Sequence, residues 1–459
     1  MSDVVHLTSG LGVNGCYAFA THRITISSPL ADEREAPMPK TTPFHARLEP
    51  LNETGIWKNW SGYLVAPRYQ YSTTFEYYAI RNSVAVLDTS PLFKYKFMGQ
   101  QSKQLLERVM ARDIGGCKLG AAQYTVWCDE RGFVLQDGVI MQVRENEYWL
   151  TAAEPALRYF RNAARQLELT DVQVEDVSSE YGILALQGPH AHNVIRQLTG
   201  DADRLKYFGL AETQIKGCDV LLSRTGFTGD LGYELWIRAD DAITVWDALM
   251  ESGVGYNITP IGTTALKMAR VEAGLLLMDV DFHSSRYAWV DAERETPIEL
   301  GWGWMFRRLK KDPRDFIGRA AIELELNDKT SRWTTVGLAI DWHDYERVHR
   351  EVGILPPKHD VYRETTMSIY RRNDREWDYA GYASTFAFSS LLKKPLAIAK
   401  LPLDLAKPGT EVDLEIPLIR KPVNVLARVE AMPFFDPPRK TAMMQSPVDL
   451  VVENSGGVQ

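Results

Sequence analysis

The feature that most limits the possible folds is a change in hydrophobic pattern near Trp333. Between about residues 80 and 275, segments with the 3.6-residue periodicity of helices alternate with short apolar runs typical of strands. After Trp333 the chain shows almost no helical pattern, and short apolar runs separated by turn residues follow one another. The pattern predicts an α+β fold in which mixed α/β or α+β lobes precede a C-terminal β-barrel or sandwich.

Four segments of the first region are predicted to be helices. In one of them, Leu105, Leu106, Val109 and Met110 fall on a single face. The predicted helices span residues 100–113, 155–167, 240–253 and 263–274. The apolar runs between and after them predict strands at residues 124–128, 132–143, 147–153, 181–188, 219–224, 233–238, 334–340, 367–372, 379–385, 395–401, 411–416 and 424–432.

The length of the chain, 459 residues, exceeds what one simple core accommodates, so two or three domains are expected. Residues 1–40 end in SSPLADEREAPMPK, which is rich in proline and charge and predicts an extension before the first domain. We expect the mixed lobes within residues 41–330, the β-barrel or sandwich within 331–440 and a poorly packed tail at 441–459.

Charge and cysteine content exclude several classes of partner. The net charge of −8 argues against nucleic acid and anionic membranes as partners. No apolar run approaches the length of a membrane span, and the N-terminus lacks the pattern of a secretion signal. The four cysteines, at positions 16, 117, 128 and 218, are scattered and form no CxxC pair. We therefore expect a cytoplasmic protein without a disulfide framework and without a metal site.

A glycine-rich stretch raises the question of what its single glutamate contacts. Residues 224–236 read RTGFTGDLGYELW, in which Glu234 stands inside an apolar run. Neither nucleotide-binding pattern fits, because no lysine follows and the glycines lead into a strand rather than a helix. Two interpretations remain: Glu234 lies on a solvated face after a turn, or it is buried and paired, since an unpaired buried charge is very costly.

A second carboxylate, Asp137, stands in the apolar run GFVLQDGVIMQV. Because Asp-Gly is a strong turn pair, a hairpin turn at Asp137-Gly138 is one interpretation. The other is a partly buried carboxylate of raised pKa that acts as a general base or accepts a hydrogen bond from a ligand nitrogen.

Several blocks follow one another in a fixed order: QYTVWCDERGFVLQDGVI, ILALQGPHA, RTGFTGDLGYELWI, RVEAGLLLMDVDF, LGWGWMF and DFIGRAAI. In this order they resemble the aminomethyltransferase family (glycine-cleavage T-proteins), including its tetrahydrofolate-dependent demethylase branch. The resemblance extends over roughly residues 42–438, with an apparent insertion around 341–376. It implies a three-domain cloverleaf around a tetrahydrofolate site, in which two interleaved mixed α/β lobes within residues 41–330 come before the C-terminal β-barrel.

The resemblance also implies roles for individual residues. Asp137 matches the family aspartate beside the reactive N5 of folate, and Glu234 matches the glutamate that holds the pterin edge. A carboxylate suits that edge because the 2-amino group and N3–H form a two-donor pair. Tyr124 and Trp302 fall in blocks that lie close to the folate in the family.

Two departures from the T-protein pattern bear on the substrate. The helix before EAG carries an Arg-Asp pair in T-proteins, whereas this chain has Leu266 and Lys267; Arg270, the arginine that survives, is expected to contact the cofactor. The family's Val-Ser-His is replaced by TSP at residues 89–91. Both changes argue against a lipoylated carrier protein as the donor.

We therefore predict transfer of a methyl group from a small donor, with an aryl methyl ether favoured by the aromatic residues, to N5 of tetrahydrofolate. Asp137 would be the catalytic base, and Tyr77, Tyr78 and Arg81 are candidates for contact with the donor and its leaving group. The alternatives are a glycine-cleavage aminomethyltransferase, an N- or S-demethylase of a small metabolite, and a folate-binding protein without turnover.

Overall fold

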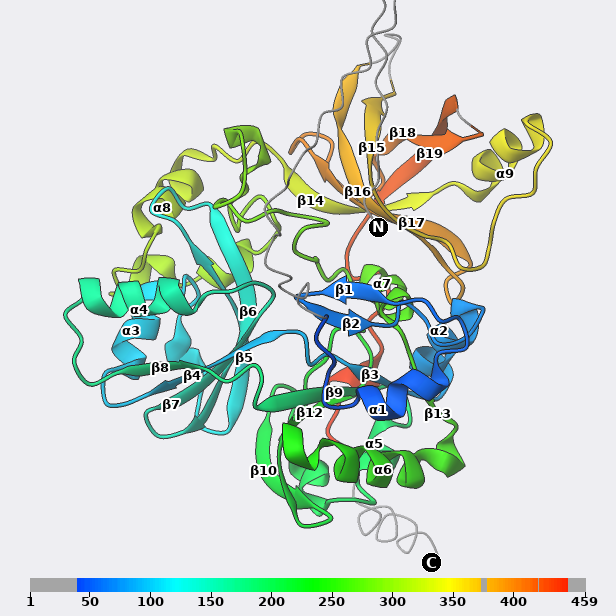
Figure 1. The fold of residues 1–459 in the computed structure, drawn as a ribbon. Coiled ribbons are helices and arrows are strands. Elements are labelled where there is room, and N and C mark those ends of the chain that lie inside the picture. Colours follow the sequence, from blue (N-terminus) through cyan, green and yellow to red (C-terminus); the bar gives the residue numbers. More distant parts are fainter. Residues whose placement is uncertain (1–38, 373–377, 420, 445–459) are drawn as a thin grey trace, which may run out of the picture. The chain divides into compact units, whose positions relative to one another are not determined.

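The computed structural model describes residues 39–372, 378–419 and 421–444. Most of the predicted N-terminal extension and of the predicted tail lies outside the described residues, as do Cys16 and four residues of the apparent insertion. The described residues from Lys40 onward belong to one compact unit, which contains three large sheets and the small two-stranded sheet β1-β2 (Figure 1). The predicted domain boundaries stay predictions.

The first sheet has six strands in the order β10-β11-β12-β9-β3-β13 (Figure 1). Only β13 and β3 pair in parallel; the other neighbours are antiparallel. The bounds are β3 Val84–Asp88, β9 Tyr181–Gln187, β10 Leu210–Ile215, β11 Cys218–Ser223, β12 Gly232–Arg238 and β13 Ile258–Pro260.

Alternate residues of these strands point to opposite helix layers. In β9, Leu184 and Leu186 pack with α5 (Ala191–Ile195) and α6 (Ala242–Gly253). Ala185, between them, packs with α2 (Thr73–Asn82) and α7 (Thr263–Glu272). Because both faces are covered, the strands read as continuous apolar runs.

The second sheet has five antiparallel strands in the order β5-β6-β7-β4-β8. Two helices, α3 (Ser102–Val109) and α4 (Leu157–Gln166), pack on it through the apolar faces that the periodicity predicted. Its strands are β4 Phe93–Met98, β5 Ala121–Cys128, β6 Val134–Arg144, β7 Glu147–Ala152 and β8 Gln173–Asp176. All of them lie between β3 and β9 in the chain, so this lobe is inserted into the first.

The third sheet is a closed six-stranded barrel, β14-β17-β16-β15-β18-β19. Its strands are β14 Thr334–Ile340, β15 Tyr362–Arg371, β16 Tyr379–Ser389, β17 Lys394–Leu401, β18 Glu411–Leu418 and β19 Lys421–Glu430. The predicted α+β class with a C-terminal barrel is thus confirmed.

The near-absence of helix predicted after Trp333 is wrong at one place, where α9 (Trp342–Glu351) lies between β14 and β15. This helix is mostly charged and buries only Tyr345, Val348 and His349, so its apolar stripe is too narrow to stand out in the sequence. The side chain of Asp341 caps it by accepting a hydrogen bond from the backbone N–H of Asp344 at 3.0 Å.

The remaining described helices and strands are shorter or connect the three sheets. They are α1 His45–Leu48, β1 Lys58–Trp60, β2 Tyr63–Val65, α8 Arg319–Asp328 and the 3₁₀ turns η1 Glu49–Leu51, η2 Ile114–Gly116, η3 Gly200–Arg204, η4 Ala239–Asp241, η5 Val254–Tyr256, η6 Asp291–Glu293, η7 Gly303–Phe306, η8 Leu309–Lys311 and η9 Pro438–Lys440.

A buried ionic cluster joins the first lobe to the barrel. Glu272, at the end of α7, is contacted by Arg81 from α2, with 2.6 Å between Nη2 and Oε2. The hydroxyls of Tyr77 and of Ser389, in β16, also donate to this carboxylate. Arg81 also contacts a second carboxylate, with 3.4 Å between its Nη1 and Oδ2 of Asp230.

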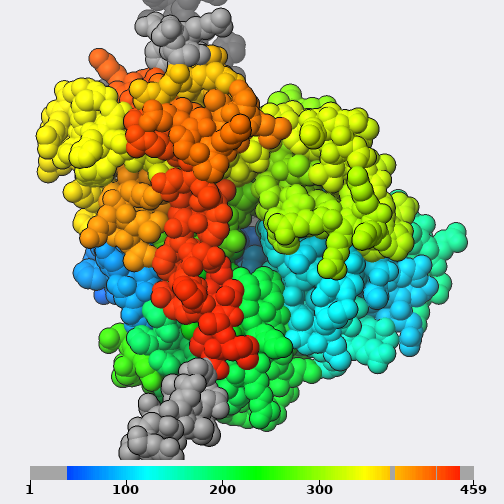
Figure 2. All heavy atoms as spheres, turned by 180° about the vertical axis from the view of Figure 1, so that it is seen from behind, coloured from blue at the N-terminus to red at the C-terminus, as the bar shows by residue number. Residues whose placement is uncertain are grey.

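The described C-terminal segment runs from the barrel back to the first lobe, as the red segment of Figure 2 shows. Asp230 accepts two hydrogen bonds from Arg439, at 2.6 and 2.8 Å. The buried guanidinium of Arg224 donates to the carbonyl oxygens of Arg439, Lys440 and Ala442. The first residues of the predicted tail are therefore held by side chains of the glycine-rich stretch.

The cluster around Glu272 predicts a large loss of stability in Glu272→Ala. The substitution leaves the buried Arg81 charge without its closest partner, which typically costs about 3–5 kcal/mol. Urea unfolding should show this decrease. Glu351→Ala, which breaks an exposed pair with Arg347 on α9, is the control and should cost less than about 1 kcal/mol. Equal losses in the two variants would contradict the assignment.

Candidate functional site

The three glycines of residues 224–236 make room for other parts of the protein. A Cβ added at Gly226 or Gly232 would lie 2.1 or 2.3 Å from the side-chain amide of Gln187, which fits between them. Gly229 has a φ of +71° and a Cβ there would lie 2.4 Å from that of Ala273. The glycines therefore serve close packing, and the amide of Gln187 fixes the loop by accepting from Thr228 at 2.8 Å.

Glu234 lies in the middle of β12, opposite Ser223 of β11 and Ala185 of β9. Thr225 donates its hydroxyl hydrogen to Oε2, and the hydroxyl oxygens of Thr225 and Ser223 are 2.6 Å apart. Burial raises the pKa of Glu234, and the Thr225 hydrogen bond opposes that rise. The interpretation of a solvated glutamate is therefore wrong. Within the described chain, Oε1 has no hydrogen-bond partner.

Asp137 lies within β6, where it pairs with Val126 of β5. The hairpin turn at Asp137-Gly138 is wrong, because β6 continues through both residues. Gly138 is needed for a close approach, since a Cβ there would lie 2.2 Å from the carbonyl oxygen of Thr151. The Asp-Gly pair thus reflects packing between strands rather than a turn.

The environment of Asp137 suits a proton acceptor. Tyr124 donates its hydroxyl hydrogen to Oδ2 at 2.8 Å. Burial raises the pKa of Asp137 to about 6, and the Tyr124 hydrogen bond acts against that rise. The side chain keeps some accessible surface, so a ligand can reach it. A carboxyl with such a pKa changes its protonation close to neutral pH.

The tyrosine that contacts this carboxyl belongs to a chain of three aromatic rings. The rings of Tyr124 and Trp302 meet edge to face at 5.6 Å between centroids. Trp302 in turn contacts Phe282 at 5.3 Å. The structure therefore brings together three of the predicted residues, Tyr124, Asp137 and Trp302, from β5, β6 and the loop before η7.

Arg270, predicted to contact the cofactor, is fully buried in contacts with protein groups. Its Nη1 contacts Asp281, and its Nη2 donates to the hydroxyls of Thr385 at 2.9 Å and Tyr362 at 3.1 Å. These contacts join α7 to the barrel. The neighbouring Lys267 is also paired, at 2.6 Å from Glu364.

The three predicted donor-contacting residues have different surroundings. Tyr77 and Arg81 are buried and turned toward Glu272. Tyr78 is only half-buried and packs in the cluster that includes Phe227 and Tyr362. Its hydroxyl has no hydrogen-bond partner among the described residues.

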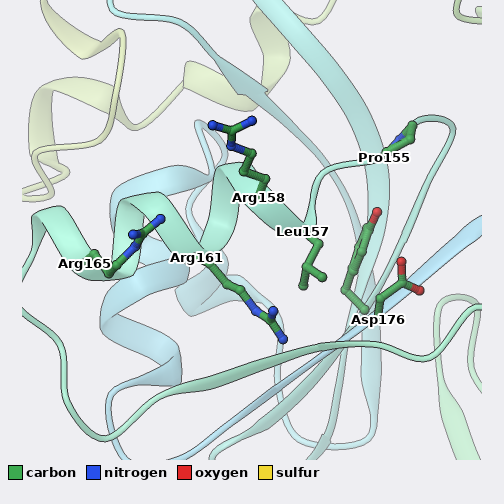
Figure 3. Close-up of a pocket in the computed structure, with 7 residues that line it drawn as sticks. Pro155, Leu157, Arg158, Arg161, Arg165 and Asp176 are labelled. Carbon is green, nitrogen blue, oxygen red and sulfur yellow. The ribbon is translucent and has the colours of Figure 1, made fainter.

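A groove of about 350 Å³ lies along α4, away from these residues (Figure 3). The side chains of Arg158, Arg161 and Arg165 project from the helix at this groove. None of the predicted site residues lines it. The described residues contain no cluster of three or more metal-binding side chains and no helix long and apolar enough to cross a membrane.

Comparison with known proteins defines the family. The family model of the GCVT N-terminal domain matches residues 50–310. An aminomethyltransferase of Saccharopolyspora erythraea is 29% identical over 400 residues, which cover 86% of this chain and 98% of that protein. A trimethylamine-oxide aldolase of Ruegeria pomeroyi is 31% identical over 320 residues, covering 67% of this chain and 39% of that protein.

Among solved structures, the glycine cleavage system aminomethyltransferase T from Bartonella henselae matches with a TM-score of 0.72 at 20% identity. The match covers 89% of this chain and 100% of that chain, so the fold is that of a T-protein. The chain belongs to the aminomethyltransferase family, as the ordered sequence blocks predicted.

Sequence reasoning missed the hydroxyls of Ser223 and Thr225, which support Glu234. The available signal was their spacing of two on either side of Arg224, with Ser223 at the end of β11 and Thr225 just beyond it, because alternate residues of extended backbone share a face.

The raised pKa of Asp137 predicts a pH-dependent effect of Asp137→Asn on stability. A folded-state value of about 6 exceeds the roughly 3.9 of an unfolded chain, so the native state loses stability as pH rises from about 4 to 6. Asn removes this cost and should raise the free energy of unfolding at pH 8 by about 1–3 kcal/mol, with a smaller gain at pH 5. Urea unfolding at both pH values measures it. Asp240→Asn, at an exposed carboxylate, is the control; a gain that is the same at both pH values would count against the prediction.

Proposed function

We propose that this protein is a tetrahydrofolate-dependent one-carbon transferase that moves a methyl group from a small donor to N5 of the folate. The observation that carries the proposal is the pair Asp137 and Glu234. Each has a raised pKa, one hydroxyl donor and one oxygen without a side-chain partner among the described residues. Two such carboxylates can each accept a further hydrogen bond or a proton from a polar group of a ligand.

The residues present fit a pterin. Its amino group and ring N–H are two parallel donors, which a single carboxylate accepts together. Glu234 is half-buried and accepts a side-chain hydrogen bond at one oxygen only, so its other oxygen can accept a charge-assisted hydrogen bond from the ligand. Glu234 would therefore hold the pterin edge, with the Ser223–Thr225 hydroxyls fixing its orientation.

Tetrahydrofolate, when bound, supplies the nitrogen that accepts the one-carbon group. Asp137 would take up or hold a proton at Oδ1, because Tyr124 occupies Oδ2. Tyr124 keeps the carboxyl from rotating, and Trp302 packs against the tyrosine ring and limits access of water. Arg270, Tyr77 and Arg81 act in this proposal through the scaffold, since their polar groups are directed at protein partners.

The aromatic cluster supports an aryl methyl ether as the donor. Tyr78, Phe227 and Tyr362 are partly buried hydrophobic residues packed against one cluster, which also contains Ala185, the strand neighbour of Glu234. The free hydroxyl of Tyr78 can donate a proton to a leaving oxygen. Rings also attract cations, so N-methylated donors are the second candidate, in line with the trimethylamine-oxide aldolase among the relatives.

The positions that depart from the T-protein pattern have local partners. Lys267 is paired with Glu364, and Leu266 packs in the cluster beneath α7. Ser90 accepts from the backbone of Ile183 at 3.0 Å. These contacts support a site that does not use a lipoylated carrier.

The direct test is to identify the folate product by mass spectrometry. The protein is incubated with tetrahydrofolate and, separately, with a methoxybenzoate, a methylated amine and a lipoylated carrier loaded with an aminomethyl group. Methyltetrahydrofolate from the methoxybenzoate is the expected result. If methyltetrahydrofolate formed only from the amine, the donor would be an N-methylated compound instead of an aryl methyl ether. If only methylenetetrahydrofolate formed, and only from the carrier, the proposal would be contradicted.

Two variants should separate binding from catalysis. Glu234→Gln places an amide donor against the donor edge of the pterin and should raise the Kd for a tetrahydrofolate about 10-fold or more. Asp137→Asn should leave Kd within about threefold and lower kcat about 100-fold or more, because proton transfer contributes on that scale. Calorimetry and steady-state kinetics measure the two effects.

Glu175→Gln, at a half-buried carboxylate on β8, is the matched control and should change neither quantity. An unchanged Kd in Glu234→Gln would show that the pterin lies elsewhere.

A further inference from the structure

Arg112 lies between the second sheet and η7, is half-buried, and differs from the buried arginines Arg81, Arg224 and Arg270. Its Nη1 donates to the backbone oxygen of Tyr124 at 2.7 Å. Its guanidinium lies over the ring of Trp304, 4.8 Å from the centroid. Within the described part of the chain, no carboxylate lies within ion-pair distance of it. The remaining N–H groups are therefore available to an anion.

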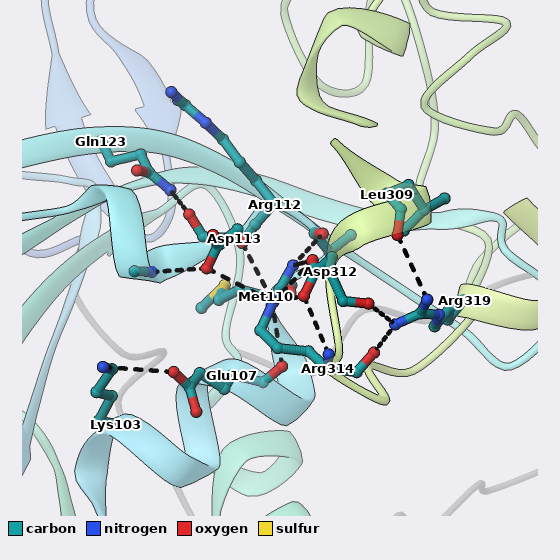
Figure 4. Close-up of polar contacts among 12 residues, drawn as sticks. Lys103, Glu107, Met110, Arg112, Asp113, Gln123, Leu309, Asp312, Arg314 and Arg319 are labelled. Atoms are coloured by element: carbon teal, nitrogen blue, oxygen red, sulfur yellow. Dashed lines mark hydrogen bonds and ion pairs between the residues drawn. The ribbon is translucent and has the colours of Figure 1, made fainter. Parts of the chain in front are cut away.

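The neighbouring carboxylates already have hydrogen-bond or ion-pair partners within the protein. Asp113 accepts from the backbone of Gly115 at 2.8 Å and lies 3.6 Å from Arg314. Arg314 is paired with Asp312 at 2.6 Å. Figure 4 shows this network and shows Arg112 extending away from it. Burial lowers the pKa of Arg112, a cost that a bound anion would offset.

Arg112 and Asp137 contact opposite ends of the same residue. The hydroxyl of Tyr124 donates to Asp137, whereas its backbone oxygen accepts from Arg112. The two groups are thus separated by up to the length of a tyrosine residue and the two hydrogen bonds at its ends, and Trp302 contacts the ring between them. A p-aminobenzoyl group has dimensions similar to those of a tyrosine side chain. A folate with N5 at Asp137 can therefore extend along Tyr124 and end near Arg112.

We propose that Arg112 and Trp304 form a carboxylate subsite that binds the glutamate end of the folate. The proposal rests on the proposed function for the identity of the ligand. A guanidinium offers two parallel N–H donors to a carboxylate, which is the geometry such a group requires. Trp304, about two-fifths exposed, provides a flat surface that holds the guanidinium plane in position.

The test compares two ligands that differ only in the glutamate. Titration calorimetry is carried out with 5-formyltetrahydrofolate and with 5-formyltetrahydropteroate, which lacks the glutamate, on the wild-type protein and on Arg112→Gln. The variant should raise the Kd of the first ligand about 10- to 100-fold and leave that of the second unchanged. Unchanged pteroate binding also shows that the variant is folded.

Arg158→Gln, which removes an exposed arginine from α4 in the same lobe, is the matched control and should affect neither ligand. Equal changes for both ligands, no change for either, or a change only in the KM of the methyl donor would each overturn the subsite. A wild-type protein that binds neither ligand would overturn the proposed function itself, which is a separate result.

Discussion

The structure depends most on the buried carboxylate of Glu272. This side chain, at the end of α7, accepts hydrogen bonds from Arg81 and Tyr77 of α2 and from Ser389 of the barrel. An unpaired buried charge is so costly that these partners have to assemble together. Arg270, on the same helix, pairs with Asp281 and donates a hydrogen bond to Thr385 of the barrel. α7 thus couples the first lobe to the barrel through charges of both signs.

Much of the fold could be predicted because its signal is local. The strands β9 and β12 are continuous apolar runs, and α3 and α4 show a helical stripe. Two features of the fold were not predicted from the sequence, for physical reasons. The helix α9 is stabilised by its Asp341 cap and by exposed ion pairs more than by apolar burial. The Asp-Gly pair in β6 has the composition of a turn, but tertiary packing against Thr151 determines its conformation.

The site could be predicted only where a resemblance supplied the role. Asp137 and Glu234 came from ordered blocks, and nothing in their local sequence separates them from structural carboxylates. Their hydrogen-bond donors, Tyr124 for Asp137 and Thr225 for Glu234, are brought next to them by the folding of the chain and are not their neighbours in sequence. Gln187 fits between two glycines some forty residues away, and single-sequence periodicity carries no information on such a contact.

The number of hydrogen-bond partners distinguishes the carboxylates that build the scaffold from the two that are proposed to bind a ligand. Glu272 has three side-chain donors, and Asp281 has three side-chain donors and one backbone donor. Asp137 and Glu234 each have one side-chain donor although burial raises the pKa of both. A buried acid with unused acceptors is stable only if something else satisfies it. The same argument applies with opposite sign to Arg112, a half-buried cation without a carboxylate partner among the described residues, which is why we propose that one elongated ligand binds all three groups.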